Sequence, residues 1–451
     1  MSDMLAIGAS GLRAYQVALS TVSENIANAG TAGYSRRTTQ IKEVASISSI
    51  STLAVGNGEG AAVVGVQRVG DMFKMAEVLS SGSDLGKTAT SVNWLDRIQT
   101  SLSGSVLSTR LSTFFTSATT LAGDPTSTAA RSAMLEAASG VAGAFSETGA
   151  SLDRVSADLD TTTRDTVSSL NSLAATLAKI NQGLGRAAPG TAGNAALLDQ
   201  RDQTLEAMSA LTDMHVTYDD AGRASVNVGG SGGPLLVDGN FNATVGYSRN
   251  ASGTMSFSVL AGVNQQTMSP TGGSLAGIID GAQRIADAQQ ELHAIASKFV
   301  GAVNSVQAQG RDLDNNPGAD IFAIDTSPGA GTAQVSVTMT DPRGIAAAAV
   351  GGGQRDNTNL AAFASIRTAG AFESRVVDMT TTNASALAQR KSVADAQQTI
   401  RDNAVSARDA LSGVDLDTEA VDLMRFQQAY SATSRVIQVA RETIQSILDI
   451  R

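Results

Sequence analysis

The chain has 451 residues, with 32 Lys or Arg against 42 Asp or Glu, so its formal charge is −10. This acidic balance gives no general attraction to nucleic acid or to anionic lipid. With 0 Cys and 2 His, disulfides and thiolate chemistry are excluded, and histidine-based metal or catalytic sites are disfavoured. Aromatic residues are few (1 Trp, 5 Tyr and 11 Phe) beside 44 Gly. Such a composition favours long helices that pack closely through small residues.

The N-terminal segment carries a seven-residue repeat of apolar positions. One set of positions is Leu5, Leu12, Leu19 and Ile26, and a second set three residues later is Gly8, Tyr15, Val22 and Ala29. This spacing predicts a helix over residues 3–29 with an a/d seam, ending near Gly30. Gly30 and Gly33 would then let the chain leave the helix and turn outward.

The C-terminal segment repeats the same pattern. Its two sets are Leu423, Tyr430, Ile437 and Ile444, followed by Phe426, Thr433, Ala440 and Ile447. Asp415 or Asp417 can cap the start of this helix. Two heptad helices at opposite ends of one chain predict that they pair as a coiled coil. The alternative is two unrelated amphipathic helices that pack on one domain.

The middle of the chain alternates between helical and extended patterns. Extended structure is expected within residues 31–70, and period-two runs separated by turn signals fill residues 215–268. Helical periodicity covers 71–122, 127–185, 194–210, 273–309 and 359–411, with short strands near 321–324 and 334–339. No segment approaches the roughly 18 apolar residues of a membrane span. The first residues also lack the pattern of a cleaved signal peptide, so any export would use another route.

These patterns predict a mainly α protein with a small inserted antiparallel β domain. The terminal heptad helices (1–40 and 412–451) form one domain, as a paired coiled coil. A long helical-bundle body comprises 41–214 and 269–411, with extended segments, and the inserted β domain comprises 215–268.

Sequences that resemble catalytic or binding motifs are weak here. Residues 82–88 (GSDLGKT) resemble a phosphate loop but lack the preceding strand and one residue of spacing, so a polar loop between helices is the better interpretation. Residues 229–233 match G-x-S-x-G around Ser231, but a strand follows where a nucleophile elbow needs a helix. A hairpin loop explains this segment.

A calcium-loop pattern and the two histidines are equally weak. The pattern begins at Asp312 but has Pro317 and Ala323 where the sixth and twelfth positions need Gly and Glu. His215 and His293 have no second ligand at a useful spacing. We therefore predict a chain that is not an enzyme and holds neither cofactor nor metal.

Both ends of the chain match a known signature. Residues 10–37 resemble the shared N-terminal signature of bacterial flagellar rod, hook and hook-associated subunits, through Ser10-Gly11-Leu12, Asn25-Ile26-Ala27-Asn28 and Thr31-x-Gly33-Tyr34-x-Arg36. Residues 412–448 resemble the C-terminal signature of the same family.

The middle of the chain resembles the hook-associated members that form the hook–filament junction. The features that carry this resemblance are Asn194–Asp202, Leu236–Gly239, Asp124-Pro125-Thr126 leading to Arg131, Gly272–Leu275 and Phe426–Tyr430. Larger members carry a second β domain after the segment that resembles Ile321–Ile324, and this chain is shorter there. Hook and rod subunits typically have Asn where this chain has Glu24, and lack a long helical body. A hook or rod subunit is the alternative within the family, and an enzyme on a helical scaffold, using Ser231, is the alternative outside it.

The resemblance implies a structural subunit that polymerises at the distal end of the hook and joins it to the filament, as required for flagellum assembly and motility. Its partners would be copies of itself in a ring or tubular layer, the hook subunit, the second hook–filament junction protein and a flagellar export chaperone. It would be secreted by type III export to the extracellular flagellum, without nucleic acid or membrane insertion.

The terminal helices would then carry the subunit packing. The candidate residues are Leu5, Leu12, Tyr15, Leu19, Val22, Ile26, Asn28, Gly33, Tyr34, Leu423, Phe426, Tyr430, Ile437, Ile444 and Ile447. Five charged side chains on or next to these helices are candidates for a polar set at the interface or in the lumen: Arg13, Glu24, Asp422, Arg425 and Arg435.

Overall fold

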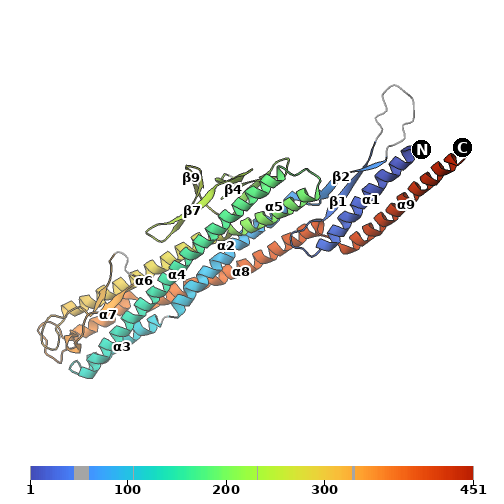
Figure 1. Ribbon diagram of the computed structural model, residues 1–451. Helices are drawn as coiled ribbons and strands as arrows, with labels where there is room; N and C mark the ends of the chain where they lie inside the picture. Colours follow the sequence, from blue (N-terminus) through green and yellow to red (C-terminus); the bar gives the residue numbers. More distant parts are fainter. Residues whose placement is uncertain (1, 45–59, 105, 231, 328–330, 450–451) are drawn as a thin grey trace.

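The computed structural model describes residues 2–44, 60–104, 106–230, 232–327 and 331–449 (Figure 1). The molecule is an elongated rod of long helices, with both chain ends at one tip. The helices are α1 (Ser2–Asn28), α2 (Met72–Ser103), α3 (Leu107–Gly123), α4 (Thr128–Leu184), α5 (Ala192–Leu211), α6 (Gly273–Gln309), α7 (Ala361–Gly370), α8 (Phe372–Ser412) and α9 (Leu416–Leu448). Short 3-10 turns occupy Pro342–Gly344 and Thr358–Leu360.

Helices α2 to α8 form the helical body. Its core at the tip far from the chain ends is a cluster of phenylalanines from several elements, because aromatic rings bury large apolar areas. Phe299 on α6 lies at the centre, 5.5 Å from the ring of Phe114 on α3 and 5.4 Å from that of Phe372 on α8. Both Phe114 and Phe299 are fully buried. The long α4 runs along most of the length of this body (Figure 1).

A buried arginine fixes the loops at the same tip. Arg131 on α4 is 1% exposed, and its guanidinium donates to the backbone carbonyls of Pro125, Ile345 and Arg343. Burial lowers the pKa of Arg131, with nearby Asp312 acting in the opposite direction. Arg131, which follows the Asp124-Pro125-Thr126 segment, thus satisfies a carbonyl of that segment and carbonyls of the loop at 343–345. It holds these two loops together.

The strands form small antiparallel sheets rather than one unit. A four-stranded sheet has the order β3-β4-β5-β6, and a three-stranded sheet has the order β7-β8-β9. Their bounds are β3 Met214–Tyr218, β4 Ala224–Val228, β5 Leu235–Asp238, β6 Phe241–Asn242, β7 Thr244–Arg249, β8 Met255–Ala261 and β9 Asn264–Met268. The sheets lie on the flank of α4 (Figure 1), and their buried side chains belong to the same core as the helices. A further two-stranded pair is β10 (Phe322–Ile324) and β11 (Val335–Val337).

The terminal unit consists of α1, α9 and a hairpin of β1 (Arg37–Glu43) and β2 (Ala61–Arg68). Helices α1 and α9 lie side by side (Figure 1), and the hairpin packs on α1, where the Thr39 hydroxyl donates to Thr21 over 2.9 Å. The sequence placed residues 41–70 with the body, but the structure places this hairpin against the terminal helix. The domain boundaries themselves stay a prediction.

Two expectations about helices are wrong in detail. Residues 82–88 are not a loop but part of the continuous helix α2, in agreement with the helical periodicity over 71–122. Gly82 and Gly86 lie where α5 approaches α2 closely, so the lack of a side chain is useful there. The helix expected over 359–411 is split at Ala371, which has φ 49°. Phe372 starts α8 there and directs its ring into the aromatic cluster.

Candidate assembly site

The terminal helices contact each other mainly through small residues on α1. Gly8 lies against Ile437, Gly11 lies against Thr433, and the ring of Tyr15 is 6.4 Å from that of Phe426. A side chain at Gly8 would collide with Ile437, so the absence of a side chain permits this close approach. The two helices are therefore adjacent as predicted, while regular knobs-into-holes packing stays a prediction.

The leucines of the N-terminal heptad do not form the buried stripe in the monomer. Leu5, Leu12 and Leu19 are half-buried, and Ile26 is 37% exposed. The fully buried face of α1 is instead Gly8, Gly11, Ala14, Ala18, Thr21, Val22 and Asn25. The physical reason is that α1 packs on two sides, against α9 and against the hairpin, and small residues fit between both.

The predicted heptad of α9 faces α1 but is only half-covered. Its inward side chains are half-buried, namely Leu423, Phe426, Tyr430, Ile437 and Ile444. The last predicted residue, Ile447, is 54% exposed. On other faces α9 leaves further large apolar side chains exposed: Leu416, Val421, Met424, Val436 and Val439. The pair of helices thus has apolar surface that the rest of the described chain does not cover.

Asn25 is the polar centre of the terminal unit. Its side chain is 1% exposed, and its amide donates to the backbone carbonyl of Arg37 (2.8 Å) and to Glu419 (3.0 Å). Its carbonyl oxygen accepts from the Tyr34 hydroxyl and from the Arg37 backbone N–H, each over 3.0 Å. All four hydrogen-bonding positions of the amide are therefore used. The residue ties together α1, the loop after it, β1 and α9.

Two arginines complete this Asn25 cluster, which we define as Asn25, Tyr34, Arg36, Arg37 and Glu419. Arg36 donates to the fully buried Glu419 over 2.6 Å, and its second nitrogen lies 3.2 Å from Asp422. Arg37 lies 3.3 Å from Glu24 and 3.5 Å from Asp199 on the body. Because removal of one partner leaves a buried charge unpaired, such pairs make the geometry specific.

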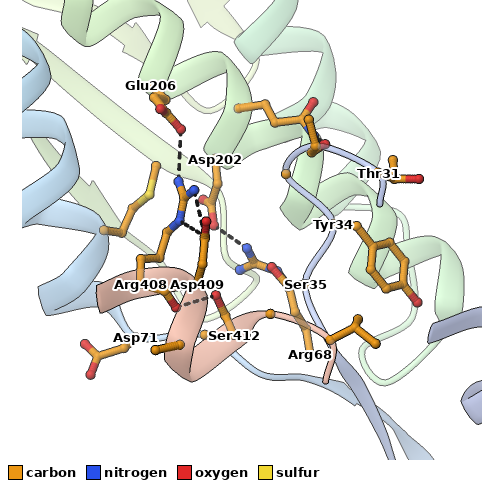
Figure 2. Close-up of a pocket in the computed structure, with 18 of the residues that line it drawn as sticks. Thr31, Tyr34, Ser35, Arg68, Asp71, Asp202, Glu206, Arg408, Asp409 and Ser412 are labelled. Atoms are coloured by element: carbon orange, nitrogen blue, oxygen red, sulfur yellow. Dashed lines mark hydrogen bonds and ion pairs between the residues drawn. The ribbon is translucent and has the colours of Figure 1, made fainter. Parts of the chain in front are cut away.

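A second set of ion pairs joins the hairpin to the body. Arg68 on β2 lies 2.6 Å from Asp199 and 2.7 Å from Asp202, both on α5. Arg68, Asp202, Glu206 and Arg408 of α8 all line a polar cavity of about 630 Å³. Figure 2 shows Arg68 bonded to Asp202 and Arg408 bonded to Glu206 at this cavity. Together with the Asn25 cluster, these pairs form the joint between the terminal unit and the body.

The remaining predicted loop residues lie at this joint. Gly33 has φ +74°, and a side chain there would collide with Gln203, so glycine is required. Gly30 has no such constraint, which corrects its expected role. Asn28 donates to the backbone of Glu24 at the end of α1 over 2.9 Å. Burial raises the pKa of Tyr34, and nearby Arg37 opposes this shift.

Tyr218 lies on the body side of the cavity. Burial is the main cause that raises the pKa of its phenol to about 12, and the guanidinium of Arg201, 4.4 Å above the ring, opposes it. The phenol is therefore neutral across the physiological range, and its ring supports Arg201 at the wall of the cavity.

Sequence reasoning did not select the residues that make the joint. These are Arg36, Arg37, Arg68, Asp199, Asp202 and Glu419. The available signal was that Arg36 and Asp199 lie inside the segments that carry the family resemblance. Of the proposed polar set, Glu24 and Asp422 do pair with arginines, and Arg425 lies 3.9 Å from Asp422.

The other sequence motifs take structural positions. His215 lies on β3, and His293 lies on α6, 3.3 Å from the Ser297 hydroxyl. Asp312 accepts from the backbone N–H groups of Asp314 and Asn316, as in an Asx turn. Ser231 lies outside the described residues. Within the described ranges, no group of three or more His, Asp or Glu side chains could hold a metal ion.

Every helix in the described parts of the chain is too short or too polar to cross a membrane.

The two ends of the chain match known protein families. Residues 5–34 match the flagella basal body rod protein family, and residues 408–450 match the C-terminal region of flagellar basal body rod FlgEFG proteins. These segments are α1 with the following loop, and α9 with the end of α8. Both terminal helices thus lie in segments that are similar to one class, the flagellar rod-type protein families.

The middle of the chain identifies the family within that class. Residues 92–322, which are just over half of the chain, match the helical domain of the flagellar hook-associated protein FlgK. The chain therefore belongs to the FlgK family of flagellar hook-associated proteins.

Individual relatives agree with this family. Flagellar hook-associated protein 1 of Salmonella typhimurium is 28% identical over 345 residues, which covers 72% of this chain and 60% of the relative. The protein of the same name in Bacillus subtilis (strain 168) is 26% identical over 486 aligned residues, which covers 97% of this chain and 96% of the relative. The chain thus spans about 60% of the length of the Salmonella protein.

Among solved structures, that of the flagellar hook junction protein FlgK from Burkholderia pseudomallei is 24% identical to this chain. The match has a TM-score of 0.49 and covers 55% of this chain and 46% of that chain.

Proposed function

We propose that this protein is a structural subunit that polymerises at the distal end of the flagellar hook and joins the hook to the filament. The observation that carries the proposal is the uncovered apolar surface of the terminal helices, in a chain of the FlgK family. On α9 alone, Val421, Val436 and Val439 are 59%, 45% and 56% exposed. Exposed apolar side chains along a paired helix favour burial against further copies of the same pair.

In this proposal the terminal pairs of neighbouring subunits form the inner wall of a ring or tube. The predicted packing residues on α1 and α9 serve two kinds of contact. Tyr15 and Phe426 pack within the subunit, and exposed side chains such as Ile26 and Ile447 pack between subunits. The joint fixes the angle at which the body leaves this wall. The chain acts as a building element and not as a catalyst.

The same proposal names the partners. They are copies of this chain, the hook subunit below it, the second hook–filament junction protein above it, and a chaperone before export. The location is the extracellular flagellum, which the chain reaches through the flagellar export channel. The family membership supports these partners and this location.

The test is a charge placed on the outer face of α9. Val439→Asp should leave the monomer folded, since this side chain is 56% exposed, but it should bury an unpaired charge in every contact of the assembled ring. Cells that carry only this variant should keep hooks, lose filaments and release flagellin into the medium.

The matched control is Val263→Asp, the same change at a β-turn residue that is 96% exposed. His293→Ala is a second control, within the body. Both should leave motility unchanged. Normal swimming of Val439→Asp cells would contradict assembly through this face of α9.

A further inference from the structure

A second groove runs between the start of α2 and strand β3, next to the joint cavity, with which it shares Met72 and Tyr218. Its volume is about 670 Å³, and it is lined by α2 residues on one side and by the consecutive residues 213–218 on the other. Consecutive residues of a strand line a groove only when the edge of the strand faces it, since alternate side chains point to opposite faces. The groove is therefore bounded by a strand edge.

The edge of β3 carries unpaired backbone groups. β3 is the outermost strand of its sheet, and among the described strands it pairs with β4 alone. The flanking bonds, Gly229 N–H to Asp213 and Asp219 N–H to Arg223, show that odd-numbered residues of this segment bond to β4. The antiparallel alternation then directs the N–H and C=O groups of Met214, Val216 and Tyr218 toward the groove. Among the described residues these groups have no hydrogen-bond partner. Exposed edges of this kind are normally covered or charged.

The side chains of the groove divide it into an apolar end and a polar end. At the apolar end, Met72 and Phe73 in the first turn of α2 are 65% and 85% exposed. At the polar end, Ser83 is 6% exposed, and its buried hydroxyl has no hydrogen-bond partner among the described residues. A buried hydroxyl without a partner costs free energy, so an incoming polar group at this end would be stabilised.

The charges of the groove indicate what it accepts. Asp84 and Asp213 line its polar end, and no Lys or Arg is among its lining residues. His215 and Tyr218 are the other titratable side chains that line the groove. The Asp213 carboxylate already accepts hydrogen bonds from the backbone N–H and the hydroxyl of Thr271. A basic residue on the ligand would therefore complement mainly Asp84, whereas an acidic segment would be repelled.

We propose that this groove binds an extended segment of a partner protein, which adds as a strand to the edge of β3. β3 has five residues, so the segment pairs over about 17 Å. Its backbone bonds to Met214, Val216 and Tyr218, its alternate side chains are apolar and contact Met72 and Phe73, and a basic residue lies beside Asp84. The proposal does not depend on the role in the hook–filament junction.

The test uses a labelled peptide with the sequence KVTVTVTK and the full-length chain, with binding followed by fluorescence anisotropy. We expect saturable binding that weakens at least tenfold for EVTVTVTE and for a KVTVTVTK peptide N-methylated on its pairing edge. Val216→Pro removes the backbone donor that faces the groove and no hydrogen bond of the ladder to β4, and it should weaken binding at least tenfold. Phe73→Ser should also weaken binding, while the control Val263→Ser should not.

Two results would overturn the proposal. The first is a failure of the peptide test: the unaltered chain shows no saturable binding, or neither Phe73→Ser nor N-methylation weakens the binding that is seen. The second is a dimer of this chain, detected by light scattering, that Val216→Pro abolishes, because the groove would then belong to a second copy. Hydrogen exchange of the β4 amides checks that each variant keeps its sheet.

Discussion

The terminal unit and the helical body are built from the same composition but stabilised differently. The tip of the body buries rings such as Phe114, Phe145 and Phe299, each fully covered. The terminal unit buries Gly8, Ala14 and other small residues, and exposes large aliphatic side chains. Because stabilisation scales with the apolar area removed from water, the body holds most of the stability of the isolated chain. The terminal unit depends for its stability on the Asn25 cluster and on burial of its exposed apolar side chains by other molecules.

The largest expected effect is in the aromatic core. Phe299→Ala should lower the free energy of unfolding of the body by about 3–5 kcal/mol, because the cavity is lined by rings that cannot collapse into it. Chemical denaturation followed by far-UV circular dichroism measures this loss. Phe73→Ala, at a ring that is 85% exposed, should change the stability by less than about 0.5 kcal/mol. Equal effects of the two variants would contradict a core centred on Phe299.

A smaller effect, confined to the terminal unit, is expected for Asn25→Ala. The change leaves the Arg37 backbone N–H, the Tyr34 hydroxyl and Glu419 without their bonds to the amide. Glu419 keeps its bond to Arg36, and Tyr34 is only half-buried, so the main loss falls on the buried backbone N–H and C=O of Arg37. The cost should be about 2–3 kcal/mol, since each buried unsatisfied group costs about 1–3 kcal/mol. Hydrogen exchange should show faster opening of α1, β1 and α9, while the denaturation curve of the body stays unchanged. A loss of body stability equal to that of Phe299→Ala would show that the two regions are not separable.

The smallest effect concerns the pH dependence at the cavity wall. Burial raises the pKa of Tyr218 to about 12, above its ordinary value of 10.0. The folded chain therefore holds this proton more tightly than the unfolded chain. The stabilisation is fully present below pH 10 and is lost as the pH rises towards 12.

A tenfold change in proton affinity corresponds to about 1.4 kcal/mol. Because the folded-state phenol is only about half ionised at pH 12, the loss of stability between pH 9 and 12 should be roughly 2 kcal/mol. Tyr218→Phe should remove this part of the alkaline loss, as measured by denaturation between pH 9 and 12. An unchanged alkaline slope in the variant would contradict the assignment to Tyr218.

The elements that could be predicted from the sequence are those with long regular periodicity. The helix expected over 127–185 is α4, Thr128–Leu184, and the one over 273–309 is α6. Strands with alternating apolar residues were predictable, but β9 was not, because Asn264–Met268 is polar and exposed except at its last residue. Its position is fixed by pairing with β8 and not by its own side chains.

The joint was beyond sequence reasoning for a different reason. Asn25, Asp199 and Glu419 are far apart in the chain, and nothing in their local spacing shows that they meet. The same limit explains the heptad of α1, where periodicity identified a helix but not its buried face. That face is set by the hairpin, which presents Thr39 to Thr21 and so turns the small residues inward.

Because the body is long, a small change of angle at the joint moves its far tip by a large distance. A helix of 57 residues such as α4 is about 85 Å long at 1.5 Å per residue. A tilt of the body by about 5° at the Asn25 cluster would displace the far tip of the body by roughly 7 Å, which is more than the rise of one helical turn. In the proposed ring, such a displacement would prevent the bodies of neighbouring subunits from meeting in register. The four hydrogen bonds of the buried Asn25 side chain are suited to fix the angle between the terminal unit and the body.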